Sequence, residues 1–291
     1  MAVHRGTGTL FVVATPIGNL EDLTFRALRI LGEVELIAAE DTRRTAKLLA
    51  HYKVRRPLVS LREHNEVREA ARLVGLLQAG KSIALVSDAG TPAIADPGAR
   101  LVSAARQAGV PVVPVPGPSA VAAAVSVSGF ALNEFVFMGF PPRSGAARAD
   151  WFERVATDPR TVVFFEAPHR IRRTLQDGAI HFGIRQIMVI REMTKIHESY
   201  VVHPSSNSFP EISSARGEFT IVLGPDSPAK RREPDSAALL ESFERLTEMA
   251  KIDEQVALAM VAAAFRVSEH GAAKLIKKAR ISVRRATGSV P

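Results

Sequence analysis

The loop at residues 86–98 constrains the fold of this chain more than any other segment. A short apolar run at 83–86 precedes it and has the composition of a buried strand, while residues 99–108 have a helical pattern. The loop is rich in glycine and proline and carries Asp88 at the strand tip. Loops that lead from the carboxyl end of a strand into a helix are common ligand sites in α/β proteins. The sequence predicts an α/β fold, with this loop either a ligand site or a plain connection.

Two further junctions repeat this strand, loop and helix pattern. An apolar run at 10–14 leads through the loop 15–24 into a helical stretch, and the run 112–115 leads through the loop 116–120 into a helix of small residues ending near 128. Glycine and proline often only punctuate short connections. Three such loops in one domain nevertheless favour a shared crevice where a ligand approaches the backbone.

Strand-like and helical patterns alternate through the first half of the chain, which predicts a largely parallel sheet with helices on both faces. Expected strands lie near 10–14, 34–38, 82–87, 112–115 and 135–138, and expected helices near 24–31, 42–52, 65–79, 99–108 and 119–128. Residues 140–148 combine two prolines with flexible polar residues and are expected to be a linker.

A second α/β unit and a helical end follow this linker. The second unit has expected strands at 161–165, 186–191, 200–203 and 218–223 and a basic helix at 170–182, with a serine-rich loop between 203 and 217. After a second linker at 225–235, helical patterns begin near Leu239 and at 254–265 and 269–279, with Asp235 and Ser268 as expected N-caps. We therefore expect an N-terminal α/β domain at 8–140, a second α/β domain at 149–225 and a basic helical extension at 235–291.

Composition limits the classes of protein to which this chain can belong. The chain has no cysteine, no apolar run long enough for a transmembrane helix and no apolar segment at its polar start, which together predict a cytoplasmic protein. The net charge of +8 is concentrated at the end, because residues 266–291 hold seven Lys or Arg and one acid. A basic end of this kind indicates contact with nucleic acid, or else a solvated helix that aids solubility.

Several familiar motifs are absent or misplaced. Residues 75–82 match the phosphate-binding pattern G-x-x-x-x-G-K-[ST], but a helix precedes them and a strand follows, the reverse of a true P-loop, so Gly80 is better explained as a helix C-cap. No G-x-G-x-x-G follows the first strand, and neither H-E-x-x-H nor G-x-S-x-G occurs. A nucleotide-hydrolysing, dinucleotide-binding, metal-dependent or α/β-hydrolase site is not expected.

Polar clusters follow three expected strands and one short apolar pair. In the first half they are residues 40–44, with Glu40, Asp41, Arg43 and Arg44, and residues 62–66, with His64. In the second unit they are residues 164–170 and 191–195. Carboxylates accept protons and arginines bind phosphate in two-point contacts. Simpler explanations are a helix cap at Asp41, Thr42 or Asn65 and an ion pair between Glu192 and Lys195.

The motifs also resemble those of a known family. VATPIGNL at 13–20, AEDTR at 39–43, EHNE at 63–66, SDAGTPAIADPG at 87–98, PGPSA at 116–120 and EAPHR at 166–170 stand in the order of the tetrapyrrole methylase superfamily. The chain is most similar to the branch that methylates small-subunit ribosomal RNA, over residues 8–224. The resemblance implies two α/β domains with a cofactor cleft between them, and S-adenosylmethionine-dependent 2′-O-methylation of a cytidine in the decoding region. It also suggests a homodimer.

The resemblance assigns cofactor contacts residue by residue. They are Thr15, Pro16 and Ile17 in the first loop; Asp88 at the strand tip; Gly90, Thr91, Pro92, Ala93 and Ile94 in the loop that follows; Ser119 and Ala120 after the Pro-Gly turn; and Phe165 and Glu166 in the second domain. Residues 205–214 and 281–291 depart from the helical segments expected there.

Proton removal and RNA binding are expected of residues near the cleft and in the basic end. Asp41, Glu166 and Lys195 follow strand ends and are the candidates for removing the proton of the ribose hydroxyl, Lys195 only if its pKa is lowered. Expected RNA contacts are Arg43, Arg44, His64, Arg170, Lys277 and Lys278. The expected partner is small-subunit rRNA or the assembled small subunit, with no DNA, membrane or metal.

Two other functions are compatible with these patterns. One is methylation of a small tetrapyrrole, because a fold does not determine a substrate. The other is that of an RNA-binding assembly factor without catalysis, which binding of S-adenosylmethionine would exclude.

Overall fold

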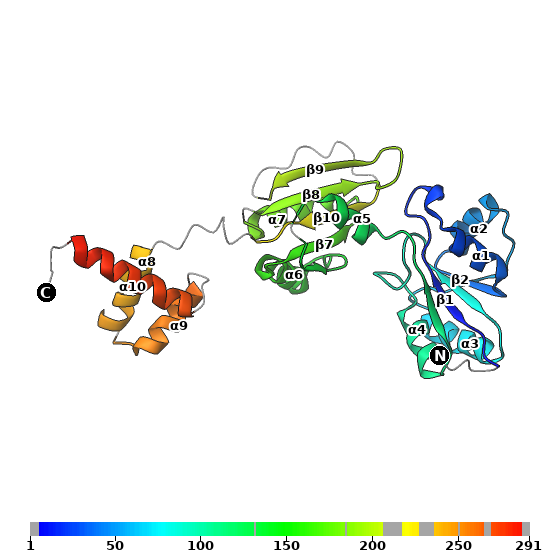
Figure 1. The fold of residues 1–291 in the computed structure, drawn as a ribbon, viewed down its shortest axis with the longest axis horizontal. Coiled ribbons are helices and arrows are strands. Elements are labelled where there is room, and N and C mark those ends of the chain that lie inside the picture. Colours follow the sequence, from blue (N-terminus) through cyan, green and yellow to red (C-terminus); the bar gives the residue numbers. More distant parts are fainter. Residues whose placement is uncertain are drawn as a thin grey trace. The chain divides into compact units, whose positions relative to one another are not determined.

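The computed structural model describes residues 6–130, 132–183, 185–205, 217–226, 236–249, 251–264 and 269–286. The chain forms two compact units, Met1–Asp226 and Ser227–Pro291, of which the first contains two β-sheets and the second is helical (Figure 1). Among the described residues, no helix is both long and apolar enough to cross a membrane.

The first sheet is parallel throughout, in the order β3-β2-β4-β1-β5. Its strands are β1 (Leu10–Val13), β2 (Leu36–Ala39), β3 (Leu58–Ser60), β4 (Ile83–Val86) and β5 (Val112–Val115). Four of them lie where the apolar runs predict strands. β3 was not predicted, because this edge strand has three residues and all are only half-buried, so its pattern is weak.

Helices cover both faces of this sheet, as the alternating pattern predicts. They are α1 (Phe25–Glu33), α2 (Thr42–His51), α3 (Glu66–Gln78) and α4 (Ala99–Gln107). Leu31 and Leu49 pack in one core against Ile37, while Leu73 and Leu101 pack in another against the opposite side of the strands. Gly80 follows α3 with φ +88° and donates to the carbonyl of Leu77, which confirms it as part of a helix C-cap.

The second sheet is mixed, in the order β6-β7-β10-β8-β9. β6 pairs with β7 in parallel and the other neighbours are antiparallel. The strands are β6 (Phe135–Phe137), β7 (Thr161–Glu166), β8 (Gln186–Arg191), β9 (Ser199–Pro204) and β10 (Phe219–Leu223). Trp151 and Phe152 of α6 (Gly145–Thr157) and Leu175 of α7 (Ile171–His181) pack against Phe164 in the core of this sheet.

The structure corrects two expectations about where the first half ends. The expected strand near 135–138 exists, but β6 joins the second sheet, and α5 (Ala120–Val127) packs on that sheet through Val125 against Ile190 and Val222. Residues 145–148 of the expected linker form the first turn of α6. Arg148 is buried there because Asp177 neutralises it, a contact that local sequence does not reveal.

The helical unit consists of α8 (Ser236–Glu244), a π-helical stretch at Arg245–Met249, α9 (Glu254–Ala264) and α10 (Glu269–Ala286). Leu239, Phe243, Val261 and Ile276 lie in its core. α10 continues to Ala286, so the expectation that residues 281–291 lack helix is wrong for 281–286. The expected caps Asp235 and Ser268 and residues 206–214 of the serine-rich segment lie outside the described residues.

Candidate functional site

A cavity of about 240 Å³ lies where the loops after β1, β4 and β5 meet the second sheet. The side of the second sheet supplies Phe140, Ile190 and Met193, together with Glu218, Phe219 and Thr220 at the start of β10. Expected cofactor residues also line it: Ile17, Gly90, Thr91, Ile94, Ser119, Ala120, Phe165 and Glu166. The three loops that the sequence singled out therefore share one cavity, which has mainly apolar walls and the acids Asp96, Glu166 and Glu218 in its lining.

The first two loops are held together by their backbones. Thr15 and Gly90 exchange two backbone hydrogen bonds of 2.9 Å, and the Thr15 hydroxyl donates to the carbonyl of Ser87 at 3.3 Å. Gly90 has φ +77°, and a Cβ at this position would lie 3.3 Å from Cγ2 of Ile17. A larger residue would be strained there and would crowd the cavity wall.

The other expected cofactor residues do not line the cavity. Pro16 and Pro92 are buried, and Ala93 has the left-handed φ of +65°. Asp88 faces away, where its carboxylate accepts from the backbone N–H of Asp41 at 3.0 Å and pairs with Arg44 at 3.4 Å. Asp88 thus connects the tip of β4 to the start of α2.

A second, polar pocket adjoins the cavity. It is lined by the acids Glu40, Asp41, Glu63, Glu66, Asp88 and Asp96 and by Arg62, His64, Ala95 and Pro97. The two hollows have only Ala95 and Asp96 in common among their lining residues. Two of the polar clusters that the sequence singled out, at 40–44 and 62–66, therefore meet in one place.

Burial and mutual repulsion raise the pKa of two acids in this pocket. Burial, then repulsion from Glu40, raises the pKa of Asp96 to about 6, with smaller contributions from Asp88 and Glu218; a hydrogen bond with Ser87 opposes the rise. Burial, then Asp88, likewise raises the pKa of Glu40. Both groups bind a proton more readily than an exposed carboxylate.

Asp41 is the N-cap of α2, as one of the simpler explanations predicted. Its Oδ1 accepts from the backbone N–H of Arg43 at 2.8 Å, and this hydrogen bond, together with Arg62 and other neighbours, lowers the pKa of the exposed carboxyl. A carboxylate stabilised in its charged form is a weaker base.

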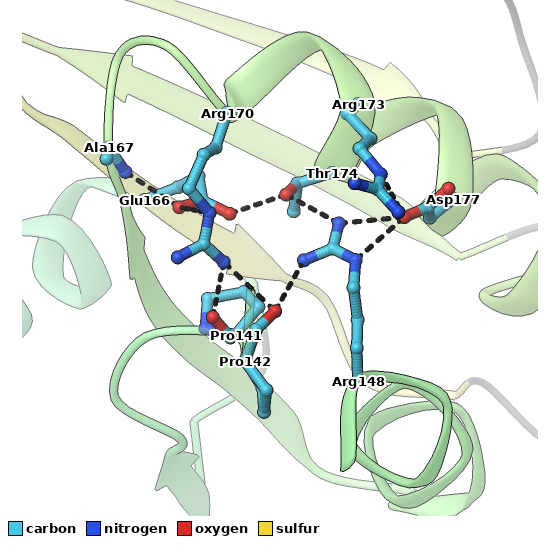
Figure 2. Close-up of polar contacts among 9 residues, drawn as sticks. All are labelled: Pro141, Pro142, Arg148, Glu166, Ala167, Arg170, Arg173, Thr174 and Asp177. Carbon is cyan, nitrogen blue, oxygen red and sulfur yellow. Dashed lines mark hydrogen bonds and ion pairs between the residues drawn. The ribbon is translucent and has the colours of Figure 1, made fainter. Parts of the chain in front are cut away.

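Glu166 lies at the end of β7, inside a network of polar contacts (Figure 2). One oxygen accepts from the backbone N–H of Ala167 at 2.8 Å and pairs with Nε of Arg170 at 3.2 Å; the other accepts from the hydroxyl of Thr174. Arg148 extends the network by donating to Thr174 at 3.0 Å and to Asp177 at 2.7 Å. The fully buried carboxylate of Glu166 therefore joins β7, α6 and α7.

Lys195 forms the expected ion pair with Glu192, at 2.8 Å, and a second with Glu218 at 3.2 Å. Burial alone would lower the pKa of Lys195, but the hydrogen bonds and charges of the two glutamates outweigh it and the pKa is raised. The amine is therefore protonated near neutral pH. The turn that carries it packs on the first loop, where the backbone N–H of Asn19 donates to the Thr194 hydroxyl at 3.0 Å.

The expected RNA contacts occupy different environments. Arg43, Arg44 and His64 are exposed near the polar pocket, which His64 lines, and Lys277 and Lys278 are exposed on α10. Arg170 differs, because it pairs with Glu166 and donates to the carbonyls of Pro141 and Pro142 (Figure 2).

Sequence reasoning missed Asp96 and the second-sheet residues Phe140, Met193 and Glu218. Asp96 stands in the loop that was singled out, but an acid directly before a proline looks like an ordinary turn residue. No local signal shows that Glu40 and Glu218, both far away in sequence, lie near it.

Comparisons with known proteins agree with this arrangement. A family model for tetrapyrrole (corrin/porphyrin) methylases matches residues 9–207. A protein of Xylella fastidiosa named Ribosomal RNA small subunit methyltransferase I is 50% identical over 221 residues, 74% of this chain and 81% of that protein. A protein of the same name from Pseudomonas aeruginosa is 41% identical over 257 residues, 87% of this chain and 91% of that protein.

Solved structures show the same fold. Uroporphyrin-III C-methyltransferase from Thermus thermophilus, solved as a complex with S-adenyl homocysteine, is 18% identical and superposes with a TM-score of 0.52, over 75% of this chain and 97% of that one. The matched domain covers most of the unit that holds both sheets and the cavity. The chain therefore belongs to the tetrapyrrole methylase family.

Proposed function

We propose that this protein transfers a methyl group from S-adenosylmethionine to the 2′-hydroxyl of a cytidine ribose in the decoding region of small-subunit ribosomal RNA. The observation that carries the proposal is the 50% identity, over 221 residues, to a protein named Ribosomal RNA small subunit methyltransferase I. The cytidine and the decoding region rest on the motif resemblance. A ribosomal substrate implies the cytoplasm as the compartment.

The cavity residues suit S-adenosylmethionine. Ile17, Phe165 and Met193 offer apolar surface to an adenine and a methionine chain, and Gly90 leaves room for a close backbone approach. Glu218 places negative charge where a ligand with a sulfonium and an amine is stabilised. When bound, this cofactor supplies a methyl group that the sulfonium charge already activates.

The polar pocket suits the acceptor nucleotide. Arg62 and His64 line it and the exposed Arg43 and Arg44 stand beside it, so a phosphate backbone meets positive charge at its rim. Because the pocket meets the cavity at Ala95 and Asp96, a ribose held there faces the cofactor site. Orientation at about 3–3.5 Å between reacting atoms supplies a large part of the rate enhancement of such a displacement.

The three residues expected to remove the proton receive positioning roles in this proposal. Asp41 caps α2 and thereby places Arg43 and Arg44. Glu166 holds the wall of the cavity at the end of β7. Lys195 is a cation that binds an RNA phosphate. Alternatively, its ion pair with Glu218 holds that cavity-lining residue in place. Lys277 and Lys278 of α10 extend RNA binding to the helical unit.

A methyl-transfer assay tests the proposal. The purified protein is incubated with S-adenosylmethionine bearing a deuterated methyl group and with small ribosomal subunits, naked small-subunit rRNA or a tetrapyrrole. We expect deuterated 2′-O-methylcytidine in the nucleoside digest by mass spectrometry. Transfer to the tetrapyrrole alone, or RNA binding without cofactor binding, would contradict the proposal and support one of the two alternative functions.

The resemblance also leads us to propose a homodimer. Edge strand β9 exposes Tyr200, Val201 and Val202, with 63%, 41% and 46% of their surfaces accessible. An apolar edge strand in solution usually pairs or is covered. Light scattering should give twice the monomer mass, and replacement of these residues by lysine should give a monomer; an unchanged mass would exclude β9 from the interface.

A further inference from the structure

Asp96 is the one ionisable residue that lines both the cofactor cavity and the polar pocket, among the side chains that the structure describes there. Ala95, the other shared residue, has no reactive group. A methyl group that passes from one hollow to the other must cross this junction. The side chain of Asp96 therefore lies beside the path that the proposed reaction requires.

The backbone around Asp96 is held in an unusual conformation. Ala93 and Ala95 have φ values of +65° and +62°, a left-handed region that residues with a Cβ seldom adopt. The end of the loop is fixed by Glu66, whose Oε1 accepts from the N–H groups of Gly98 at 2.9 Å and Arg100 at 3.0 Å. Such strain, maintained by surrounding contacts, is typical of functional sites.

The charged groups around Asp96 come from several elements. Glu40 follows β2, Asp88 follows β4 and Glu218 precedes β10, and all three repel its negative charge. The contribution of Ser87 lowers the pKa of Asp96, and Arg62 and His64 also line the polar pocket. Burial, reinforced by repulsion from these acids, raises the pKa of Asp96 to about 6. A group with a pKa near the working pH is an effective base.

We propose that Asp96 is the catalytic base that takes the proton of the ribose 2′-hydroxyl, an inference that rests on the proposed methyltransferase function. As the 2′-oxygen forms its bond to the methyl carbon, the bond between that carbon and sulfur breaks and its electron pair stays on sulfur. The hydroxyl proton passes to the carboxylate of Asp96. The products are the 2′-O-methyl ribose, the neutral thioether and a protonated Asp96, which releases its proton to water.

The test compares Asp96→Asn with the full-length wild-type protein. Asparagine keeps the shape and cannot accept the proton, so single-turnover methylation should fall by about 100-fold or more while calorimetric S-adenosylmethionine binding stays within a few fold. Asp96→Glu should regain part of the rate. Asp150→Asn, an exposed acid on α6, is the matched control and should keep the wild-type rate.

The pH profile separates a base from a residue that only shapes the loop. With cofactor limiting, the wild-type rate should decline below about pH 6 as Asp96 becomes protonated, and the residual rate of Asp96→Asn should lose this decline. A near-normal rate with the same profile, or loss of cofactor binding, would overturn the inference. A wild-type protein that methylates no RNA would instead refute the proposed function.

Discussion

At the residue scale, the cofactor cavity depends on small side chains where the loops approach one another. Ser119 begins α5, and its hydroxyl accepts from the backbone N–H of Ala122 at 3.5 Å while the residue lines the cavity. Gly90 and Ala120 are likewise small. One serine thus both lines the cavity and caps a helix.

Ser119→Trp should abolish calorimetric binding of S-adenosylmethionine, because an indole placed at this wall fills the cavity. The lost cap should cost about 1 kcal/mol, which leaves the protein folded by circular dichroism. Ser126→Trp, on the exposed face of the same helix, is the control and should bind normally. Unchanged binding by Ser119→Trp would exclude Ser119 from the site.

The raised pKa of Asp96 should also make the free energy of unfolding depend on pH. Its folded pKa of about 6 exceeds the value of 3.8 expected when unfolded, so the folded state holds the proton more tightly. The free energy of unfolding therefore contains a penalty that is absent below about pH 4, grows between pH 4 and 6 and is complete above pH 6. Charging a partly buried acid costs free energy in the folded state.

Asp96→Asn removes this titration. The unfolding free energy of the variant minus that of the wild type should be about 1 kcal/mol larger at pH 8 than at pH 4.5, once solvent screening is allowed for. Urea denaturation at the two pH values measures the difference. A gain that does not change with pH would show that the folded pKa of Asp96 is not raised.

At the scale of elements, the Glu166 network explains how the second sheet holds its edge of the cavity. Arg148 from α6 and Arg170 before α7 both donate to the carbonyl of Pro142, and both connect to Glu166, Arg148 through Thr174 (Figure 2). A buried carboxylate needs such partners, and removing its charge leaves cations without compensation.

Glu166→Gln should lower the free energy of unfolding by about 1.5–3 kcal/mol, since hydrogen bonds to a charged group are lost inside the protein. Glu153→Gln is the comparison, because the exposed pair of Glu153 with His181 is worth less than about 1 kcal/mol. Chemical denaturation measures both variants. Equal stability of the two would mean that the network does not stabilise the second sheet.

At the scale of the whole molecule, the proposed cofactor cavity and the basic helix α10 lie in different units of the chain. The cavity and polar pocket lie in the unit Met1–Asp226, whereas Lys274, Lys277 and Lys278 are exposed on α10 of the other unit. Counterions released from RNA by such lysines make affinity depend on salt. We therefore expect mutations to separate RNA binding from methyl transfer.

Replacing all three lysines by glutamine should weaken RNA binding and reduce the slope of log affinity against log salt by about 2. Cofactor binding should stay unchanged. A control that replaces three exposed arginines of α1, α4 and α6 (Arg29, Arg106 and Arg154) removes the same charge from the other unit. An equal effect of both triple variants in fluorescence anisotropy would show that α10 adds only net charge.

The sequence by itself determined the class of fold and the edge on which the site lies. Apolar runs such as those of β1 and β4 predict buried strands, because side-chain periodicity and composition are local properties. The carboxyl ends of parallel strands share one edge, so loops that follow them in sequence also meet in space. Caps such as Asp41 and Gly80 depend on a few neighbouring residues and were predictable for the same reason.

Only the tertiary structure decided which segments pair and which acids repel. β6 joined the second sheet because its partner β7 lies beyond a whole helix, and a strand pattern does not name its partner. The pKa of Asp96 depends first on burial and then on acids such as Glu40 and Glu218, which are remote in sequence and close in space. Coulomb interactions and burial act through distance between atoms, so they emerge only after the chain has folded.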